Sequence, residues 1–353
     1  MKRIIAWILV TLMACSVAGC GKKERVPAPD QVAESVQVIA MDTVMQVTAY
    51  GENRTTALQQ AEEEIHRLEE LFSRTRVDSE IALLNRMPGK GVEVGEEVCS
   101  LLRAAGEYTA VTGGAFDITV APIVSAWGFT TESQQIPAKE ELNELLAFVG
   151  MEHVHLDDET AILDEGTQVD LGGIAKGYAS DLVGKIFQEN DIPRGTIQLG
   201  GNVLAWGQRP DGQPWRVGIQ DPKHPEDGSA LAAVIGLSDA FAVTSGSYQR
   251  FFEEDGKLYH HIIDPATGYP ADNGLTSVTV VADGGIGNGT MCDALSTALF
   301  VMGEERALEF WRSSVYDVEL VLVTEDDRVV VTDGLKDALM EIEESGYTYE
   351  IVS

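Results

Sequence analysis

The chain has few cysteines, no internal repeat and no low-complexity segment. Four of its 353 residues are cysteine. Cys15 and Cys20 fall in an N-terminal leader, whereas Cys99 and Cys292 lie far apart and without CxxC spacing. A disulfide between Cys99 and Cys292 is possible in an oxidising compartment, but nothing in the sequence requires one.

Cationic side chains are also scarce. Lysine and arginine number 25 against 57 aspartate and glutamate residues, so the formal net charge is −32. Such a surface repels nucleic acid and anionic lipid headgroups. A bound anion therefore needs a pocket that is locally positive or filled by a metal ion.

The N-terminus lacks an apolar run long enough to span a bilayer. Lys2 and Arg3 precede residues 4–14, which are apolar except for Thr11, and small residues follow as far as Cys20. Crossing about 30 Å of hydrocarbon takes roughly 20 helical residues. A charged start, a short apolar run and small residues at the cut form a secretory signal instead.

A cysteine directly after the small residues is typical of a bacterial lipoprotein signal. We therefore predict that residues 1–19 are removed, that Cys20 is acylated, and that residues 20–35 form a flexible tether. The alternatives are an ordinary signal peptide in which Cys20 is incidental, and a cut before Cys15. The prediction places the protein outside the cytoplasm, anchored to a bacterial membrane by lipid.

Residues 36–353 are predicted to form an α+β domain of mixed, largely antiparallel sheets with flanking helices, as one large unit or two interlocked subdomains. Apolar periodicity predicts helices over 54–72, 96–112, 138–149, 172–189, 289–302 and 304–313. Strands are predicted over 36–50, 153–157, 160–164 and 167–170, within a β-rich stretch from 195 to 283, and in a hairpin at 317–332.

The segment 169–178 contains the first candidate site. Its glycines allow close approach of a ligand, and free N–H groups at a helix start, together with Lys176, favour a phosphate. The P-loop spacing is absent. A strand-to-helix turn capped by Asp170 is an equally good interpretation of these residues.

A second candidate pair is Asp293 and Thr297, which lie four residues apart on one face of a largely buried helix. A carboxylate and a hydroxyl on a buried face need partners, and hard oxygen ligands suit Mg²⁺. An internal hydrogen-bonded pair is the favoured alternative when these two residues are considered alone.

Two adjacent histidines form a third candidate. On a strand, His260 and His261 point to opposite faces and cannot readily share one metal. One of them, facing a cleft, could serve as a general base or contact a phosphate. The alternative is a strand that ends in an Asp-Pro turn, with Asp264 and Gly268 bracketing the turn and one histidine exposed.

The remaining candidates lie in three short segments. In the segment 112–122, Phe116 could line an aromatic ligand and Asp117 could accept hydrogen bonds from it; a helix end followed by a buried strand is the alternative. Segments 199–202 and 243–248 are predicted to be backbone-defined loops at strand ends, with either a binding or a purely structural role.

Taken together and in this order, the segments resemble the FAD:protein FMN transferases, the ApbE-type flavin transferases. The resemblance runs from Met41 to the final hairpin. Its most specific parts are residues 113–117 (Gly-Gly-Ala-Phe-Asp), 170–179 (Asp-Leu-Gly-Gly-Ile-Ala-Lys-Gly-Tyr-Ala), 244–248, 261–268, and Asp293 with Thr297. It implies cleavage of the FAD pyrophosphate, transfer of FMN to a Thr or Ser hydroxyl of a partner protein, release of AMP, and a need for Mg²⁺.

The resemblance also implies a role for each matched residue. Mg²⁺ would be held by Asp293, Thr297 and the backbone carbonyl of Gly173. His261 would be the base for the acceptor hydroxyl, or an essential partner of it. The positions expected to contact FAD are Met41, Ala115, Phe116, Asp117, Asp170, Lys176 and Ile263.

Three positions depart from the pattern of some relatives. Thr75 stands where some place a tyrosine that stacks on the flavin, and Asp42 replaces a common glycine. Ser296 stands where some have a third acidic ligand, so the coordination sphere would hold more water.

The acceptors implied are flavin-carrying subunits of Rnf-type or sodium-pumping quinone reductase complexes, or other secreted flavoproteins. Two other functions are considered: an FAD pyrophosphatase that releases FMN and AMP, and a non-catalytic FAD-binding lipoprotein. Asp293 and Thr297 argue against the second, because a carrier has no need of a catalytic metal pair.

Overall fold

The computed structural model describes residues 28–129, 131 and 133–353. The predicted signal peptide, Cys20 and residues 20–27 of the predicted tether lie outside the described residues. The first strand, β1 (Ala33–Ala40), begins before residue 36, where the sequence placed the start of the folded region. In the described part of the chain, no helix combines the length and the apolar character needed to cross a membrane.

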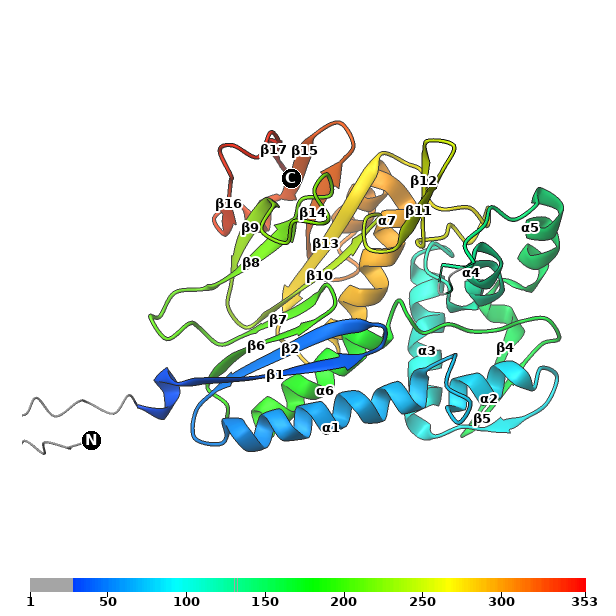
Figure 1. Cartoon of the computed structure of the whole chain (residues 1–353), viewed down its shortest axis with the longest axis horizontal. Helices are drawn as coiled ribbons and strands as arrows, with labels where there is room; N and C mark the ends of the chain where they lie inside the picture. Colours follow the sequence, from blue (N-terminus) through cyan, green and yellow to red (C-terminus); the bar gives the residue numbers. More distant parts are fainter. Residues whose placement is uncertain (1–27, 130, 132) are drawn as a thin grey trace, which may run out of the picture.

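A nine-stranded sheet runs through the centre of the molecule (Figure 1). Seven of the eight neighbouring strand pairs described in it are antiparallel, and β15 and β17 run parallel. This confirms the predicted α+β fold with largely antiparallel sheets. In spatial order the strands are β1, β2 (Thr43–Tyr50), β6 (Arg194–Leu199), β7 (Asn202–Trp206), β10 (Ala240–Gly246), β13 (Leu275–Asp283), β14 (Glu319–Thr324), β15 (Arg328–Thr332) and β17 (Thr348–Val352).

Three long helices cover one face of this sheet: α1 (Arg54–Phe72), α6 (Ala175–Glu189) and α7 (Asn288–Arg312). The other face is covered by a small sheet of β8 (Trp215–Gln220), β9 (Leu231–Leu237) and β16 (Leu339–Met340). Alternating strand residues supply both layers: Leu320 and Leu322 pack in the core under the helices, whereas Val321 and Val323 pack under the small sheet. This two-sided burial explains the continuous apolar runs of the central strands.

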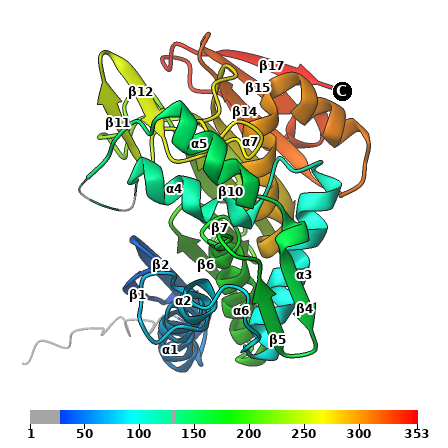
Figure 2. The same cartoon turned by 90° about the vertical axis from the view of Figure 1, so that its right-hand side faces the viewer.

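Residues 73–174 form a second, mostly helical region inserted between α1 and α6. It contains α2 (Glu80–Arg86), β3 (Val92–Glu93), α3 (Glu96–Val111), α4 (Ala121–Trp127), α5 (Lys139–Leu145), β4 (Val154–Asp157) and β5 (Thr160–Leu163). Figure 2 shows this region toward the viewer, with α4 and α5 above α2 and the β4–β5 hairpin. The hairpin of β11 (Phe251–Glu254) and β12 (Lys257–His260) packs against it through tilted aromatic rings, including Phe252 and Trp127.

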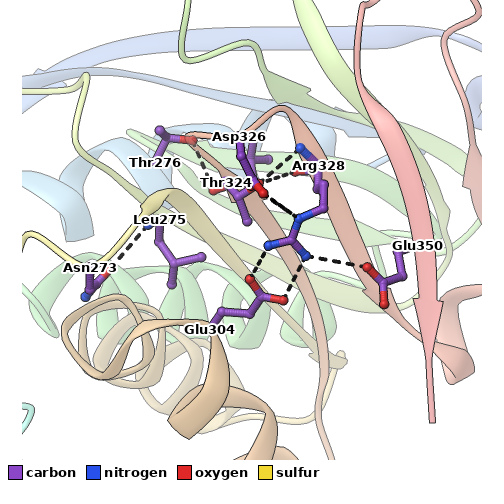
Figure 3. Close-up of polar contacts among 9 residues, drawn as sticks. Asn273, Leu275, Thr276, Glu304, Thr324, Asp326, Arg328 and Glu350 are labelled. Carbon is purple, nitrogen blue, oxygen red and sulfur yellow. Dashed lines mark hydrogen bonds and ion pairs between the residues drawn. The ribbon is translucent and has the colours of Figure 1, made fainter.

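Helix α7 changes direction at Gly303, where the sequence predicted a boundary between two helices. Gly303 has φ 78° and ψ 169°, which only glycine adopts readily. Asn273 donates hydrogen bonds to the carbonyls of Phe300 (2.7 Å) and Val301 (3.2 Å), so it caps the first part of α7. Just beyond the break, Glu304 accepts two hydrogen bonds from Arg328, at 2.6 and 2.9 Å (Figure 3).

Three local predictions were wrong. Residues 36–50 form a hairpin instead of one strand, because Met41 and Asp42 (φ 50° and 58°) form a two-residue turn between β1 and β2. Residues 167–170 are a loop, and α6 starts at Ala175 instead of residue 172. The alternative considered for the segment 112–122, a buried strand after the helix end, is also excluded, because the residues after Asp117 are helical.

Two other features concern single side chains. Asn53 occupies the N-cap position of α1, but its side chain donates to the carbonyl of Asn190 instead of capping the helix. Cys99 and Cys292 are buried free thiols, so the disulfide left open by the sequence is not formed.

Candidate active site

A cleft of about 760 Å³ contains every described residue that the sequence predicted for the site. This volume falls in the range of cofactor pockets, about 300–1,000 Å³. Its walls come from the β1–β2 turn, the C-terminal end of α1, the first turn of α6, the middle of α7 and the loop after β12. The predicted residues along it are Met41, Ala115, Phe116, Asp117, Asp170, Gly173, Lys176, His261, Ile263, Asp293 and Thr297.

The loop that precedes α6 brings Gly173 close to Thr297. A Cβ atom at Gly173 would lie 3.5 Å from Oγ1 of Thr297 and 3.1 Å from a ring carbon of Phe116. Both Asp170 and Lys176 support this loop: Oδ1 of Asp170 accepts from the N–H of Gly172 (2.9 Å), and Nζ of Lys176 donates to the carbonyl of Gly172 (2.8 Å). Asp170 is therefore both a turn cap and part of the cleft wall.

Asp293 is almost fully buried, and its two carboxylate oxygens have different surroundings. Oδ2 accepts a hydrogen bond from the backbone N–H of Gly177 (2.8 Å). Oδ1 lies 3.8 Å from Nζ of Lys176. A buried carboxylate with one oxygen held by the backbone is oriented without using all its lone pairs, so Oδ1 can take a further partner from the cleft.

The hydroxyl of Thr297 begins a chain of hydrogen bonds through Ser245, which also lines the cleft, to Ser296, which does not. The hydroxyl of Ser296 donates its proton to the carbonyl of Asp293 (3.0 Å). The Ser296 Oγ can therefore only accept in its hydrogen bond with Ser245 (2.9 Å). Ser245 has then used its proton and accepts from Thr297 (3.3 Å). The proton of Thr297 therefore points toward Ser245, which leaves its oxygen lone pairs for another partner.

Oxygen donors of this kind fit a Mg²⁺ ion. They are one carboxylate, one hydroxyl with free lone pairs, and the neighbouring Gly173 backbone, all of them hard ligands. Within residues 28–129, 131 and 133–353 no group of three or more His, Cys, Asp or Glu residues is placed to hold a metal. Mg²⁺ usually keeps several waters and binds substrate phosphates, so it needs few ligands from the protein. Ser296 is fully buried and does not line the cleft.

His261 and His260 lie on opposite sides, as predicted. His260 is buried and hydrogen bonds the carbonyl of Ala271 (2.9 Å), whereas His261 lines the cleft. Nδ1 of His261 lies 3.2 Å from the carbonyl of Arg250, which can only accept, so Nδ1 carries the proton and Nε2 is the acceptor. Burial, with Arg250 and His260 nearby, lowers the pKa of His261 to about 3.

Asp117 and Phe116 shape the opposite wall. Oδ1 of Asp117 accepts from the N–H and the hydroxyl of Thr119, at 2.8 and 2.5 Å. Burial raises the pKa of Asp117 above its ordinary value, although these hydrogen bonds act in the other direction. Phe116 packs edge-on against Tyr108.

Three arginines along the cleft were missed by sequence reasoning: Arg74, Arg76 and Arg250. Nε of Arg74 lies 3.2 Å from Oδ2 of Asp170. With Lys176, these arginines place four cationic side chains along the cleft, among the carboxylates of Asp42, Glu69, Asp117, Asp170 and Asp293 that also line it. No spacing could have revealed them, because a loop after α1 and a turn after β10 bring them together from distant parts of the chain. Thr75 lines the cleft as well.

The fold matches that of ApbE proteins of known structure, among them flavin transferases. The ApbE protein of Thermotoga maritima is 34% identical, with a TM-score of 0.79 over 88% of this chain and all of that one. The flavinyl transferase ApbE of Pseudomonas stutzeri is 27% identical, with a TM-score of 0.76 over 87% of this chain and 96% of that one. Among curated relatives, the FAD:protein FMN transferase of Haemophilus influenzae is 33% identical over 98% of this chain and its own full length.

The ApbE family model matches residues 41–322. The chain belongs to the ApbE family.

Proposed function

We propose that this chain is an FAD:protein FMN transferase. The observation that carries the proposal is the convergence on one cleft of Asp293, Thr297, the Gly173 backbone and His261, which come from three separate stretches of sequence. A shared cleft supports joint action of these groups on one substrate. Relatives that bear this activity name match nearly the whole chain, which adds further support.

The reaction would be a transfer of a phosphoryl-linked group. A Thr or Ser hydroxyl of the acceptor attacks the phosphorus on the riboflavin side of the FAD pyrophosphate, in line with the bridging oxygen. The new O–P bond forms as the bond from phosphorus to the bridging oxygen breaks, and AMP leaves. Nε2 of His261 takes the hydroxyl proton, because Nδ1 is already protonated and bound to the Arg250 carbonyl.

Mg²⁺ is part of this proposal. Asp293, Thr297 and the Gly173 carbonyl would hold it. When bound, it would offset the pyrophosphate charge and polarise the phosphorus that is attacked. Lys176, Arg74 and Arg250 add positive charge along the same cleft.

FAD itself would occupy the rest of the cleft. Met41, Ala115, Phe116 and Ile263 provide apolar walls, and Asp117 and Asp170 provide oxygen acceptors. Thr75 lies at the position where some relatives have a stacking tyrosine, so the flavin ring would lack that contact here.

The acceptors and the location are also proposed. Acylation of Cys20 would anchor the enzyme to a bacterial membrane, facing the extracytoplasmic side. The tether would raise the effective concentration of membrane-bound acceptors. Flavin-carrying subunits of Rnf-type or sodium-pumping quinone reductase complexes, or other secreted flavoproteins, fit this location.

One incubation distinguishes the proposed activity from its alternatives. The purified protein is mixed with FAD, Mg²⁺ and a candidate acceptor, and AMP release and acceptor mass are followed. An acceptor that gains one FMN, with an equal amount of AMP, is the expected result. FMN and AMP without labelling would show a pyrophosphatase, and intact FAD would show a carrier.

A further inference from the structure

Helices α6 and α7 each cap the first turn of the other. Asp293, in the second turn of α7, accepts from the N–H of Gly177, the third residue of α6 (2.8 Å). Asp181 in α6 accepts from the N–H groups of Gly289 (2.9 Å) and Thr290 (2.8 Å) in the first turn of α7, and from the hydroxyl of Thr290 (2.5 Å). First-turn N–H groups have no partner within their own helix, so both carboxylates meet a need that the helices create.

This reciprocal capping depends on a close crossing of the two helices at a pair of glycines. A Cβ atom at Gly289 would lie 2.7 Å from the carbonyl oxygen of Gly177, and one at Gly177 would lie 2.7 Å from Cβ of Asp293. Both distances are too short for a real side chain, so the backbones touch at this point. Asp181 and Asp293 each keep 3% of their surface exposed, and water therefore cannot replace either carboxylate as an acceptor.

We propose that Asp181 is a positioning residue for Asp293. The inference rests on the proposed function in one respect, namely that Asp293 is a ligand of the metal ion. Asp293 lies one helical turn after Gly289, so its direction follows from how that first turn is held. Asp181 is not among the cleft residues, so it acts through α7 and not by touching substrate.

Removing the Asp181 carboxylate leaves buried donors without acceptors. Buried donors without acceptors destabilise the local structure, which favours opening of the first turn of α7. Asp293 then moves relative to Gly173 and Thr297. The consequence is weaker metal binding and a looser hydrogen bond at Gly177, although Asp181 contacts neither group.

Three variants test this. Asp181→Asn keeps the side-chain volume and one acceptor oxygen, Asp181→Ala keeps neither, and Thr290→Val removes one donor only. The control is Arg328→Gln, which breaks the pair with Glu304 beyond the Gly303 break (Figure 3) and should lower stability without touching the first turn of α7.

The first measurement is Mg²⁺ affinity with FAD present. Asp181→Ala should weaken binding by about 10- to 100-fold, as loss of a residue behind a metal ligand typically does, and Asp181→Asn should recover part of the loss. Arg328→Gln should bind as the wild type does. Wild-type Mg²⁺ affinity in both Asp181 variants would overturn the proposal.

The second measurement is amide hydrogen exchange at Gly177 in metal-free protein. We expect faster exchange in the Asp181 variants and in Thr290→Val, but not in Arg328→Gln. If the Asp181 variants do not fold, Thr290→Val decides alone, and unchanged exchange at Gly177 would contradict the proposal. If the wild-type protein neither binds Mg²⁺ nor transfers FMN, the proposed function is wrong. Hydrogen exchange at Gly177 would still show whether Asp181 positions Asp293.

Discussion

Ser245 on β10 holds its hydroxyl oxygen 3.3 Å from that of Thr297 on α7, which directs the Thr297 proton toward Ser245. Without this acceptor, the Thr297 hydroxyl would turn and present its proton to a cation. We expect Ser245→Ala to lower the affinity for Mg²⁺ by about 10-fold, the smaller of the effects seen when a residue behind a metal ligand is lost. The affinity is measured from the rate of FMN transfer as a function of Mg²⁺ concentration. Thr276→Ala, which removes a hydroxyl that donates to the Val323 carbonyl and does not line the cleft, is the matched control.

Asp293 supplies the one carboxylate of the candidate metal site. Asp293→Ala should abolish FMN transfer and also release the N–H of Gly177. Transfer is followed by the mass of the acceptor. Wild-type turnover by this variant in the presence of EDTA would end the metal hypothesis.

Gly173 separates Phe116 from Thr297. A methyl group there would lie 3.1 Å from the Phe116 ring, which is a tight contact that shifts the ring or the loop, and 3.5 Å from the Thr297 hydroxyl, which is an ordinary contact. We expect Gly173→Ala to raise the KM for FAD and weaken Mg²⁺ binding while the protein stays folded. Gly212→Ala is a useful comparison, because a Cβ atom at Gly212 meets nothing within 4 Å, although its φ of 77° adds some strain.

His261 should make acid stability depend on pH. Its pKa is about 3 in the folded protein and near 6.5 in the unfolded chain, so between these values only the unfolded state binds the proton. The free energy of unfolding should therefore fall as pH drops through this window. His261→Asn should flatten that slope, measured as urea midpoints from pH 7 to 4.5. The exposed His66, changed to Asn, should leave the slope as it is.

FAD should shift the same histidine in the opposite direction. A bound pyrophosphate brings negative charge near the ring, which favours the imidazolium form and raises the pKa of His261. The NMR titration of its ring protons with and without FAD tests this. An unchanged pKa would place the pyrophosphate away from His261 and argue against its role as the base.

Much of the site could be predicted because its residues lie in short segments whose order is distinctive. The helical periodicity of α1 and the i, i+4 spacing of Asp293 and Thr297 follow from local geometry, and both were predicted. The hairpin turn at Met41 and Asp42 was missed because Met has no preference for a left-handed φ, so Asp42, which tolerates that conformation, was the one signal of the break. Arg250 and Arg74 were missed for a different reason: only tertiary packing brings them to the cleft.

The reciprocal capping of α6 and α7 by Asp293 and Asp181 could not be predicted from the sequence either. Asp181 looks like an ordinary polar residue on a helix, and only the contact between Gly177 and Gly289 reveals its partners. A pattern of glycine on each of two helices, with an aspartate four residues further on, is a signal that could be sought in other chains.

The β1–β2 hairpin lies between the N-terminal segment and the candidate active site. β1 is an extended strand of eight residues, about 26 Å long at 3.3 Å per residue, and its far end turns at Met41 into the cleft wall. It acts as a rigid spacer between the segment that precedes Ala33 and the site. If Cys20 carries the lipid, the height at which this enzyme works above a membrane is set in part by the length of a strand, and acceptors would be selected by how far their hydroxyl stands from the bilayer.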